Sequence, residues 1–366
     1  MIYCGASRKQ NPIGWVTARK LTRSAKEGIA YRSMAMKKFI NDPKNLAKEL
    51  LDGFTIAHGD LVTVKSDKIV CRIQPKPANK VALVTLGGAG HEPALSGFVG
   101  EGMLDYSVVG DILAAPGTPR VIEALRLAQR DAGILFVVLN HPGDVLSATM
   151  AMEMADQEGI RYKLLLTHED IAPGASAPAE DRRGLVGCIP LFKIAGAAAE
   201  AGRSLEEVHA LARRFNDNMA TLAVAMKIAT HPASGQAILE LADDEMEIGM
   251  GQRGDAGTGP SKILSADQTA ELMLSRLVAA VKAKAGDRLM LLLNGIGATT
   301  LMELYIVLRG CKKFLDAQGI PLAVAECGEW LTVQEMAGFQ MFVARMDDEL
   351  LQYWNAPCHT PALTMK

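Results

Sequence analysis

Apolar residues recur along this chain in two spacings, which predict alternating strands and helices. Continuous apolar runs at 81–86, 134–139 and 162–166 are typical of strands that are buried on both faces. Between these runs, at 118–131, apolar residues return every three or four positions, as they do in helices. A second helix is expected at 144–158, where Asp144 can cap its start and Gly159 ends it. This order predicts a parallel sheet with covering helices.

The rest of the chain continues the alternation and contains clear helix starts. Asp42-Pro43 is expected to open an early helix over 45–54, with Pro at its first position. Ser204–Glu207 is interpreted as a capping box, in which Ser and Glu side chains satisfy free N–H groups. Further expected elements are helices at 266–283 and 301–318, and strands at 288–293, 321–326 and 339–344.

The chain of 366 residues, of which 49% are hydrophobic, is too long for one ordinary core. We predict two α/β domains, at 36–215 and 216–366, each a largely parallel or mixed sheet covered by helices. Residues 1–35 differ, because they hold seven Lys or Arg residues and one acidic residue. They lack the apolar region of a secretory signal. We interpret them as a disordered extension or the product of an upstream start codon, with a targeting peptide as the alternative.

Charge and cysteine usage narrow the classes of function. The chain has 39 basic and 41 acidic residues, of which 32 and 40 lie after residue 35. The body of the protein is therefore acidic, and nucleic acid is not expected as the main partner. The 6 cysteines include no Cys-x-x-Cys pair and do not indicate a disulfide framework or a zinc site. No apolar run is long enough to span a membrane. We therefore expect a cytoplasmic protein with no metal site and no membrane partner.

The most informative chemistry follows two of the predicted strands. The first strand ends at Gly87-Gly88-Ala89-Gly90, where bare backbone lets a ligand approach, and His91 comes directly after. The 140–144 turn, which ends in Asp144, follows the next strand, so both turns lie at the edge where open α/β sheets bind ligands. His91 and Asp144 are a candidate acid–base pair. The alternatives are a hydrogen-bonded histidine in a tight turn, and Asp144 as a helix N-cap.

A second glycine-rich segment, Gly249–Gly254, matches G-x-G-x-x-G. It follows the acidic 243–245 segment and precedes the loop 255–260, so no helix is placed to hold a pyrophosphate. The chain also contains no Gly-Lys-Ser/Thr phosphate-binding loop and no Gly-x-Ser-x-Gly turn. We therefore expect no nucleotide site on this chain.

These turns resemble, in order, the motifs of one family. Gly87–Pro93 is similar to the Gly-Gly-Gly-Ser-Gly-His-Glu-Pro signature of the K subunit of dihydroxyacetone kinase. The resemblance covers 36–366 and leaves 1–35 without an equivalent. Other similar segments are Gly143-Asp144, Arg182-Arg183-Gly184, Asp244–Gly249, Gly297-Ala298-Thr299, Met336–Phe339 and Trp354–Leu363.

The resemblance implies a homodimeric cytoplasmic subunit that binds a small hydroxyketone, ketose or related polyol but no nucleotide. A separate L subunit would hold ADP or ATP with Mg²⁺ and deliver the phosphoryl group. The phosphate would come from ATP or, through bound ADP, from a phosphocarrier of the phosphotransferase system. By the same resemblance, His91 hydrogen-bonds the reacting hydroxyl and Asp144 is the general base. The implied substrate-binding set is Gly87, Gly88, Gly90, His91, Ala115, Asp144 and Arg253.

The chain departs from the family at its covalent site. The family holds its ketone on a histidine in Gly-Val-Gly-Ile-His-Gly, whereas this sequence has Arg253 at that position. A guanidinium stays protonated and cannot be a nucleophile at neutral pH. Ala115 also replaces a substrate-contacting Ser, and Pro142 replaces a Thr.

Two hypotheses follow from this departure. In the first, the chain is a kinase subunit with altered substrate choice, and Arg253 binds a carboxylate, phosphate or sulfonate. In the second, it is a regulatory paralogue that senses a metabolite for a partner protein. The retained pair of His91 and Asp144 favours the first hypothesis, and loss of the covalent histidine favours the second. Arg253 has a third interpretation as a structural ion pair.

Overall fold

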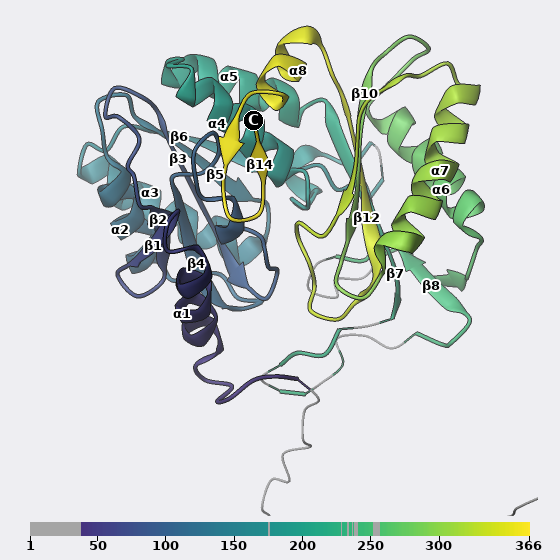
Figure 1. The fold of residues 1–366 in the computed structure, drawn as a ribbon, viewed down its shortest axis with the longest axis horizontal. Helices are drawn as coiled ribbons and strands as arrows, with labels where there is room; N and C mark the ends of the chain where they lie inside the picture. Colours follow the sequence, from purple (N-terminus) through teal and green to yellow (C-terminus); the bar gives the residue numbers. More distant parts are fainter. Residues whose placement is uncertain are drawn as a thin grey trace, which may run out of the picture. The chain divides into compact units, whose positions relative to one another are not determined.

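The computed structural model describes residues 38–366, except 175, 228, 233, 236, 238–240 and 252–256. The predicted extension 1–35 therefore lies outside the described residues. Residues 37–366 form one compact unit. Its described residues hold two six-stranded sheets with covering helices, and one short two-stranded sheet (Figure 1). The predicted fold class, α/β with two helix-covered sheets, is confirmed.

The first sheet has a parallel centre and an antiparallel edge. Its strand order is β1-β2-β4-β3-β5-β6. Strands β4, β3, β5 and β6 run parallel, whereas β2 pairs antiparallel with both β1 and β4. The strands are β1 (Val62–Lys65), β2 (Ile69–Arg72), β3 (Ala82–Ala89), β4 (Tyr106–Ile112), β5 (Ile134–Leu139) and β6 (Tyr162–Thr167).

Side chains alternate along β3, so each face of this sheet packs against different helices. Val84 and Leu86 lie in a core with α2 and α3, whereas Leu83 lies in a core with α1, α4 and α5. The helices are α1 (Leu46–His58), α2 (Thr118–Ala128), α3 (Pro142–Gln157), α4 (Cys188–Glu200) and α5 (Leu205–Asn216). With both faces covered, the loops at the carboxyl ends of the strands are where a ligand can reach the sheet.

The second sheet has the order β11-β10-β12-β7-β8-β9, with only β10 and β11 parallel among its described pairs. Helices α6 and α7 cover its outer face (Figure 1). The elements are β7 (Met219–Lys227), β8 (Glu245–Ile248), β9 (Pro260–Lys262), α6 (Ala266–Ala280), β10 (Leu289–Gly295), α7 (Leu301–Ala317), β11 (Leu322–Gly328) and β12 (Ala337–Arg345).

The two sheets share one central core. Met290, Leu292 and Phe342 of the second sheet belong to the same buried cluster as α4 and α5. The chain then returns to the first sheet through α8 (Asp348–Trp354), β13 (Cys358–His359) and β14 (Thr364–Met365) (Figure 1). Both halves therefore lie in one compact unit, and the predicted division at 215/216 stays a prediction.

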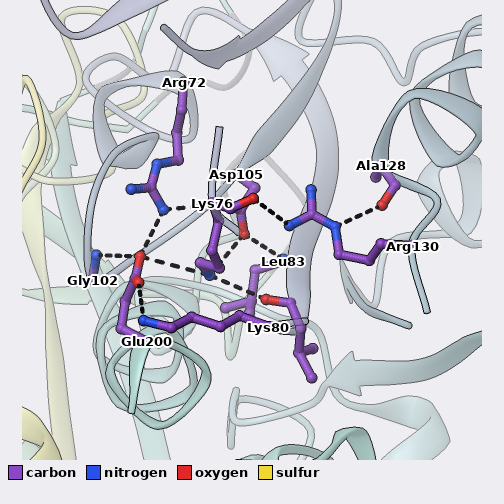
Figure 2. A network of polar contacts seen from close by, with 10 residues as sticks. Arg72, Lys76, Lys80, Leu83, Gly102, Asp105, Ala128, Arg130 and Glu200 are labelled. Atoms are coloured by element: carbon purple, nitrogen blue, oxygen red, sulfur yellow. Dashed lines mark hydrogen bonds and ion pairs between the residues drawn. The ribbon is translucent and has the colours of Figure 1, made fainter. Parts of the chain in front are cut away.

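Buried ion pairs join the amino ends of the strands to α4 (Figure 2). Lys76 Nζ lies 2.9 Å from Asp105 Oδ2, and these two side chains are 0% and 2% exposed. Arg72 Nη1 lies 3.2 Å from Asp105 Oδ1 and 2.6 Å from Glu200 Oε1. The backbone N–H of Leu83 donates a further bond to Asp105 at 2.8 Å. This edge of the sheet is therefore held by compensated charge.

Helix starts differ in how well they are predicted. The capping box at Ser204 is confirmed, because its side chain and that of N3 glutamate both bond the backbone. The expected opening at Asp42-Pro43 is wrong, since α1 begins at Leu46 with Asn45 as its N-cap. The Asp42 carboxylate accepts from Lys44 N at 3.0 Å, so this dipeptide makes a separate turn before the helix.

The sequence does not predict β4 or β7. β4 contains Ser107, Gly110 and Asp111, which interrupt the apolar run. β7 is rich in Ala and Met, which have little strand preference of their own. Both strands are buried between neighbours in their sheets, so tertiary packing decides their conformation.

Candidate active site

Strand β3 delivers its glycines to a crowded edge of the sheet. A Cβ on Gly88 would lie 2.8 Å from Ala114 N and 2.9 Å from Ala114 O, so only glycine fits there. Gly90 has a φ of +98°, which side chains rarely adopt. The turn after β3 therefore brings bare backbone against the loop that follows β4, as the sequence indicates.

His91 is oriented by a segment from the second half of the chain. Its Nδ1 lies 2.8 Å from Thr332 O, and its own carbonyl accepts from Thr332 N at 3.1 Å. Because a carbonyl oxygen only accepts, Nδ1 carries the hydrogen, and in the neutral ring Nε2 holds the lone pair. The side chain is buried. The second half thus fixes which nitrogen of His91 serves chemistry.

Asn294, at the end of β10, supports this contact. Its Oδ1 accepts from Trp330 N at 2.8 Å and Leu331 N at 3.1 Å, and its Nδ2 donates to Leu331 O at 2.7 Å. Thr332 Oγ1 in turn donates to Glu92 O at 2.8 Å. A fully buried amide therefore holds the segment that positions the histidine.

The start of α3 supplies the other polar groups. His141 is the N-cap residue and Pro142 the first helical residue, so the expectation of Asp144 as N-cap is wrong. Proline has the φ that a first helical position needs, and the helix begins there. Asp144 lies in the first turn and is 2% exposed, where the helix N-terminus favours a carboxylate. His141 Nε2 lies 2.9 Å from Gly184 O.

The two turns meet at a small cavity, which we call the active-site cavity. Its volume is about 20 Å³, enough for one water-sized group. His91 and Asp144 share its wall with the backbone of Gly87 and Gly88. The residues that line it are Leu86, Gly87, Gly88, His91, Ala94, Leu95, Leu139, His141, Asp144 and Leu331.

Two further predicted residues lie beside this cavity and not in its wall. Gly90 turns the chain toward His91, and its N–H donates to both carboxylate oxygens of Glu92, at 2.9 and 3.1 Å. Ala115 follows Ala114, whose backbone packs against Gly88. Their predicted part in substrate binding stays a prediction.

Arg253 lies outside the described residues, but one end of its loop can be located. Gly249 O accepts from Arg183 Nη2 at 2.8 Å, and the Arg183 guanidinium also pairs with Asp170 at 2.7 Å. Arg183 is followed by Gly184, whose carbonyl contacts His141. Gly249, at the start of the loop, is therefore bonded to Arg183, and the next residue, Gly184, contacts His141 in the wall of the active-site cavity.

Glu169 is a buried carboxyl behind the same wall. Its Oε1 accepts from Leu185 N at 2.6 Å and from Gly187 N at 2.9 Å. The pKa of Glu169 is raised to about 7, chiefly by burial and to a smaller extent by the neighbouring Asp170, against the lowering effect of the backbone N–H groups. No Lys, Arg or His of the described residues forms an ion pair with it. The carboxyl therefore holds the 185–187 segment next to Gly184.

Sequence reasoning missed His141, Leu331 and Thr332. His141 had a signal, since it directly follows a predicted strand and precedes a helix-starting proline. Thr332 lies 241 positions from His91 and had none. Contacts of this kind depend on the shared core between the sheets.

Other kinds of site have little support in the described part of the chain. No group of three or more His, Cys, Asp or Glu side chains there is placed to hold a metal ion. None of its helices is long and apolar enough to cross a bilayer. Its cysteines are free thiols: Cys71, Cys188, Cys311, Cys327 and Cys358.

Comparison with known proteins places this geometry in one family. The Dak1 domain matches residues 52–362. A relative in Listeria innocua serovar 6a is PTS-dependent dihydroxyacetone kinase 1, dihydroxyacetone-binding subunit DhaK. It is 36% identical over 315 residues, which are 86% of this chain and 95% of that protein.

Solved structures agree with this assignment. The dihydroxyacetone kinase operon co-activator Dha-DhaQ superposes with a TM-score of 0.82 at 29% identity, covering 87% of this chain and 98% of that one. The native dihydroxyacetone kinase of C. freundii also gives 0.82 at 29% identity, covering 90% of this chain and 60% of that one. The chain therefore belongs to the Dak1 family, that of the dihydroxyacetone-binding subunits of dihydroxyacetone kinases.

Proposed function

We propose that this chain is the substrate-binding subunit of a dihydroxyacetone-kinase-like phosphotransferase. Its substrate would be a small hydroxyketone, ketose or related polyol. One observation carries the proposal: His91 and Asp144 line one cavity with the backbone of Gly87 and Gly88, in a chain of this family. The cavity lies at the sheet edge where α/β folds bind ligands.

The two side chains have separable roles in this proposal. A hydroxyl group both donates and accepts, so one substrate oxygen can contact both residues. The Asp144 carboxylate accepts the hydroxyl hydrogen and takes the proton as phosphoryl transfer proceeds. His91, whose Nδ1–H donates to Thr332 O, presents Nε2 for a hydrogen bond with the same oxygen. Burial of both groups keeps their orientation fixed before the substrate arrives.

The phosphoryl group must come from a partner in this scheme. The sequence has no phosphate-binding loop, so we propose that a separate L-type subunit holds ADP or ATP with Mg²⁺. Either ATP or a phosphocarrier of the phosphotransferase system would supply the phosphate. We also propose that the chain is a homodimer, which light scattering of the purified protein tests directly.

Arg253 points to a change of substrate within this scheme. Gly249, at the start of its loop, is bound to Arg183, next to the Gly184 carbonyl that His141 contacts. An arginine delivered there would bind an anionic group bidentately, where the family uses a covalent histidine. We therefore propose an acceptor that carries both a hydroxyl and a carboxylate, phosphate or sulfonate group.

A substrate panel with the cognate L-type subunit tests this function. Purified chain, partner, ATP or phosphorylated phosphocarrier are incubated with dihydroxyacetone, neutral ketoses and their acidic analogues, and phosphorylated product is measured by mass spectrometry. We expect product only when both subunits are present, with acidic acceptors preferred. Arg253→Ala should weaken the use of acidic acceptors and spare neutral ones. Equal loss for both classes would contradict the role of Arg253.

The regulatory alternative rests on a specific likeness. The co-activator Dha-DhaQ matches 98% of its length to this chain. If the chain is a sensor, it should bind a panel compound without phosphorylating it and should alter the DNA binding of a partner protein. Product formation with any panel compound excludes a purely sensory role.

A further inference from the structure

A second cavity, which we call the α1 cavity, lies next to the active-site cavity and has no part in the proposed reaction. Its volume is about 730 Å³, within the range of about 300–1,000 Å³ that is usual for small-molecule sites. It is formed by α1, the 87–97 segment, two residues of β4 and the 361–362 turn. Gly87, Gly88, Ala94 and Leu95 belong to both cavities.

Most of the wall is apolar, with the half-buried carboxyl of Glu92 in it. Leu50 and Phe54 of α1 line this space together with Leu95, which precedes the short 96–98 turn, and Val109 of β4. No Lys or Arg lines it among the described residues. The apolar surface would favour a hydrocarbon body of a ligand over water.

Glu92 supplies the charge of this cavity. Both of its carboxylate oxygens accept from Gly90 N, which holds the group in one orientation. Desolvation by burial raises the pKa of Glu92, against the lowering effect of the Gly90 N–H. No Lys, Arg or His of the described chain forms an ion pair with it, unlike Asp105 at the other end of the sheet. A partly desolvated carboxyl without a cation is best compensated by a cationic ligand.

The rim of the α1 cavity carries a negative charge, as Glu92 does in its wall. Glu49 is exposed there, and its carboxylate accepts from Asn41 Nδ2 at 2.7 Å. His58, at the other end of α1, also lines the cavity, with its ring 5.1 Å from that of Phe54. The entrance therefore attracts cations and repels carboxylates.

We propose that the α1 cavity binds a second small molecule, which has an apolar body and a protonated amine. The hydrocarbon lies between Leu50, Phe54 and Leu95, and the amine pairs with Glu92. The α1 cavity shares four wall residues with the active-site cavity, but its ligand is distinct from the phosphoryl acceptor, so a test of its binding does not depend on the proposed reaction.

Titration calorimetry with n-octylammonium, octanoate and 1-octanol, each below its micellar concentration, tests the site on the full chain. We expect octylammonium to bind at least tenfold more tightly than octanoate, with octanol between them. Glu92→Gln keeps an acceptor for Gly90 N, so it should fold, and it should weaken octylammonium at least tenfold while leaving octanol unchanged. Octanoate binding as tight as octylammonium binding, or no effect of Glu92→Gln, would overturn the proposal.

A blocking variant tests the location. Gly53 lies on α1 in the cavity wall, and a Cβ built on it meets no atom within 4 Å. Gly53→Trp should therefore fill the cavity and abolish binding of octylammonium. Ala57→Trp is the matched control, because this exposed α1 position is not part of the wall. Unchanged octylammonium binding in Gly53→Trp would overturn the proposal. The proposal would also be overturned if the parent chain bound no octylammonium and Gly53→Trp lost the dimer.

Discussion

Asp105 and Glu169 are both buried carboxyl groups of the first half of the chain, but their surroundings differ. Asp105 precedes β4 at the amino edge and contacts Lys76 and Arg72 (Figure 2). Glu169 follows β6 at the opposite edge and contacts only backbone N–H groups among the described residues. The buried carboxyl of Asp105 is therefore compensated by ion pairs, whereas that of Glu169 is held by backbone N–H groups.

This difference separates a structural edge from a functional edge. A paired buried charge is costly to disturb but has no capacity for a ligand. The carboxyl edge keeps Asp144 and two imidazoles at a cavity and places a carboxyl with a raised pKa behind them. Groups held in this way are typical of sites that bind and react. The two edges should therefore respond to substitution in opposite ways.

The largest expected effect is at the carboxyl edge. Asp144→Asn keeps the shape of the side chain but removes the base, so kcat with the L-type partner should fall about 100- to 10,000-fold. Chemical denaturation should show little change in stability. Asp156→Asn, the same substitution on the exposed end of α3, is the control and should keep full activity. Near-normal turnover in Asp144→Asn would contradict the assignment of the base.

The opposite response is expected at the amino edge. Asp105→Asn leaves Lys76 buried without its counter-charge, so the free energy of unfolding should fall by about 3–5 kcal/mol. The kcat of the folded fraction should not change. Asp111→Asn replaces the exposed partner of Lys68 and should alter stability little. A large kcat defect in folded Asp105→Asn would mean that the two edges are not separable.

Much of the carboxyl edge can be predicted from the sequence, because its information is local. An apolar run that ends in glycines predicts the edge, and the residues after it, His91 and Asp144, stand at the ends of predicted strands. The glycine at 88 is required by backbone contact with Ala114, which the motif reflects. Local signals of this kind survive without knowledge of the rest of the fold.

The amino edge and the support of the site cannot be predicted in this way. Neither Lys76 nor Asp105 lies in a recognisable motif, and their pairing depends on β3 lying beside β4. The contact of His91 with Thr332, and that of Asn294 with Leu331, depend on how the two sheets share a core. The spacing of residues along the sequence does not indicate how the two sheets pack, so these contacts can be identified only from the tertiary structure.

A smaller effect that should distinguish the two edges is the pH dependence of stability that Glu169 contributes at the carboxyl edge. Burial raises the pKa of Glu169 from the ordinary 4.5 of an unfolded chain to about 7. The folded protein then binds this proton more tightly than the unfolded chain does. The stability contribution is therefore complete below about pH 4.5 and is lost as the pH rises to about 7 and above.

Glu169→Gln isolates this contribution, because glutamine keeps an acceptor for Leu185 N and Gly187 N. Denaturant midpoints of parent and variant should be measured from pH 4 to pH 8. The variant should lose less stability than the parent over this range, so the difference between the two should grow with pH. A constant difference would mean that Glu169 does not titrate there.

The smallest expected effect is a loss of stability at the amino edge when a helix cap, and no buried charge, is removed. Ser204 caps α5, and the helix starts near that edge, where Leu205 lies close to Gly133 and Glu206 contacts Arg161. Ser204→Ala removes one acceptor for a free N–H, so the free energy of unfolding should fall by about 1 kcal/mol with kcat unchanged. Ser265→Ala, at the equivalent capping box of α6 on the second sheet, should cost about the same. If Ser204→Ala instead lowers kcat, a change at the amino edge affects the active site through the sheet. The amino edge would then contribute to catalysis as well as to stability.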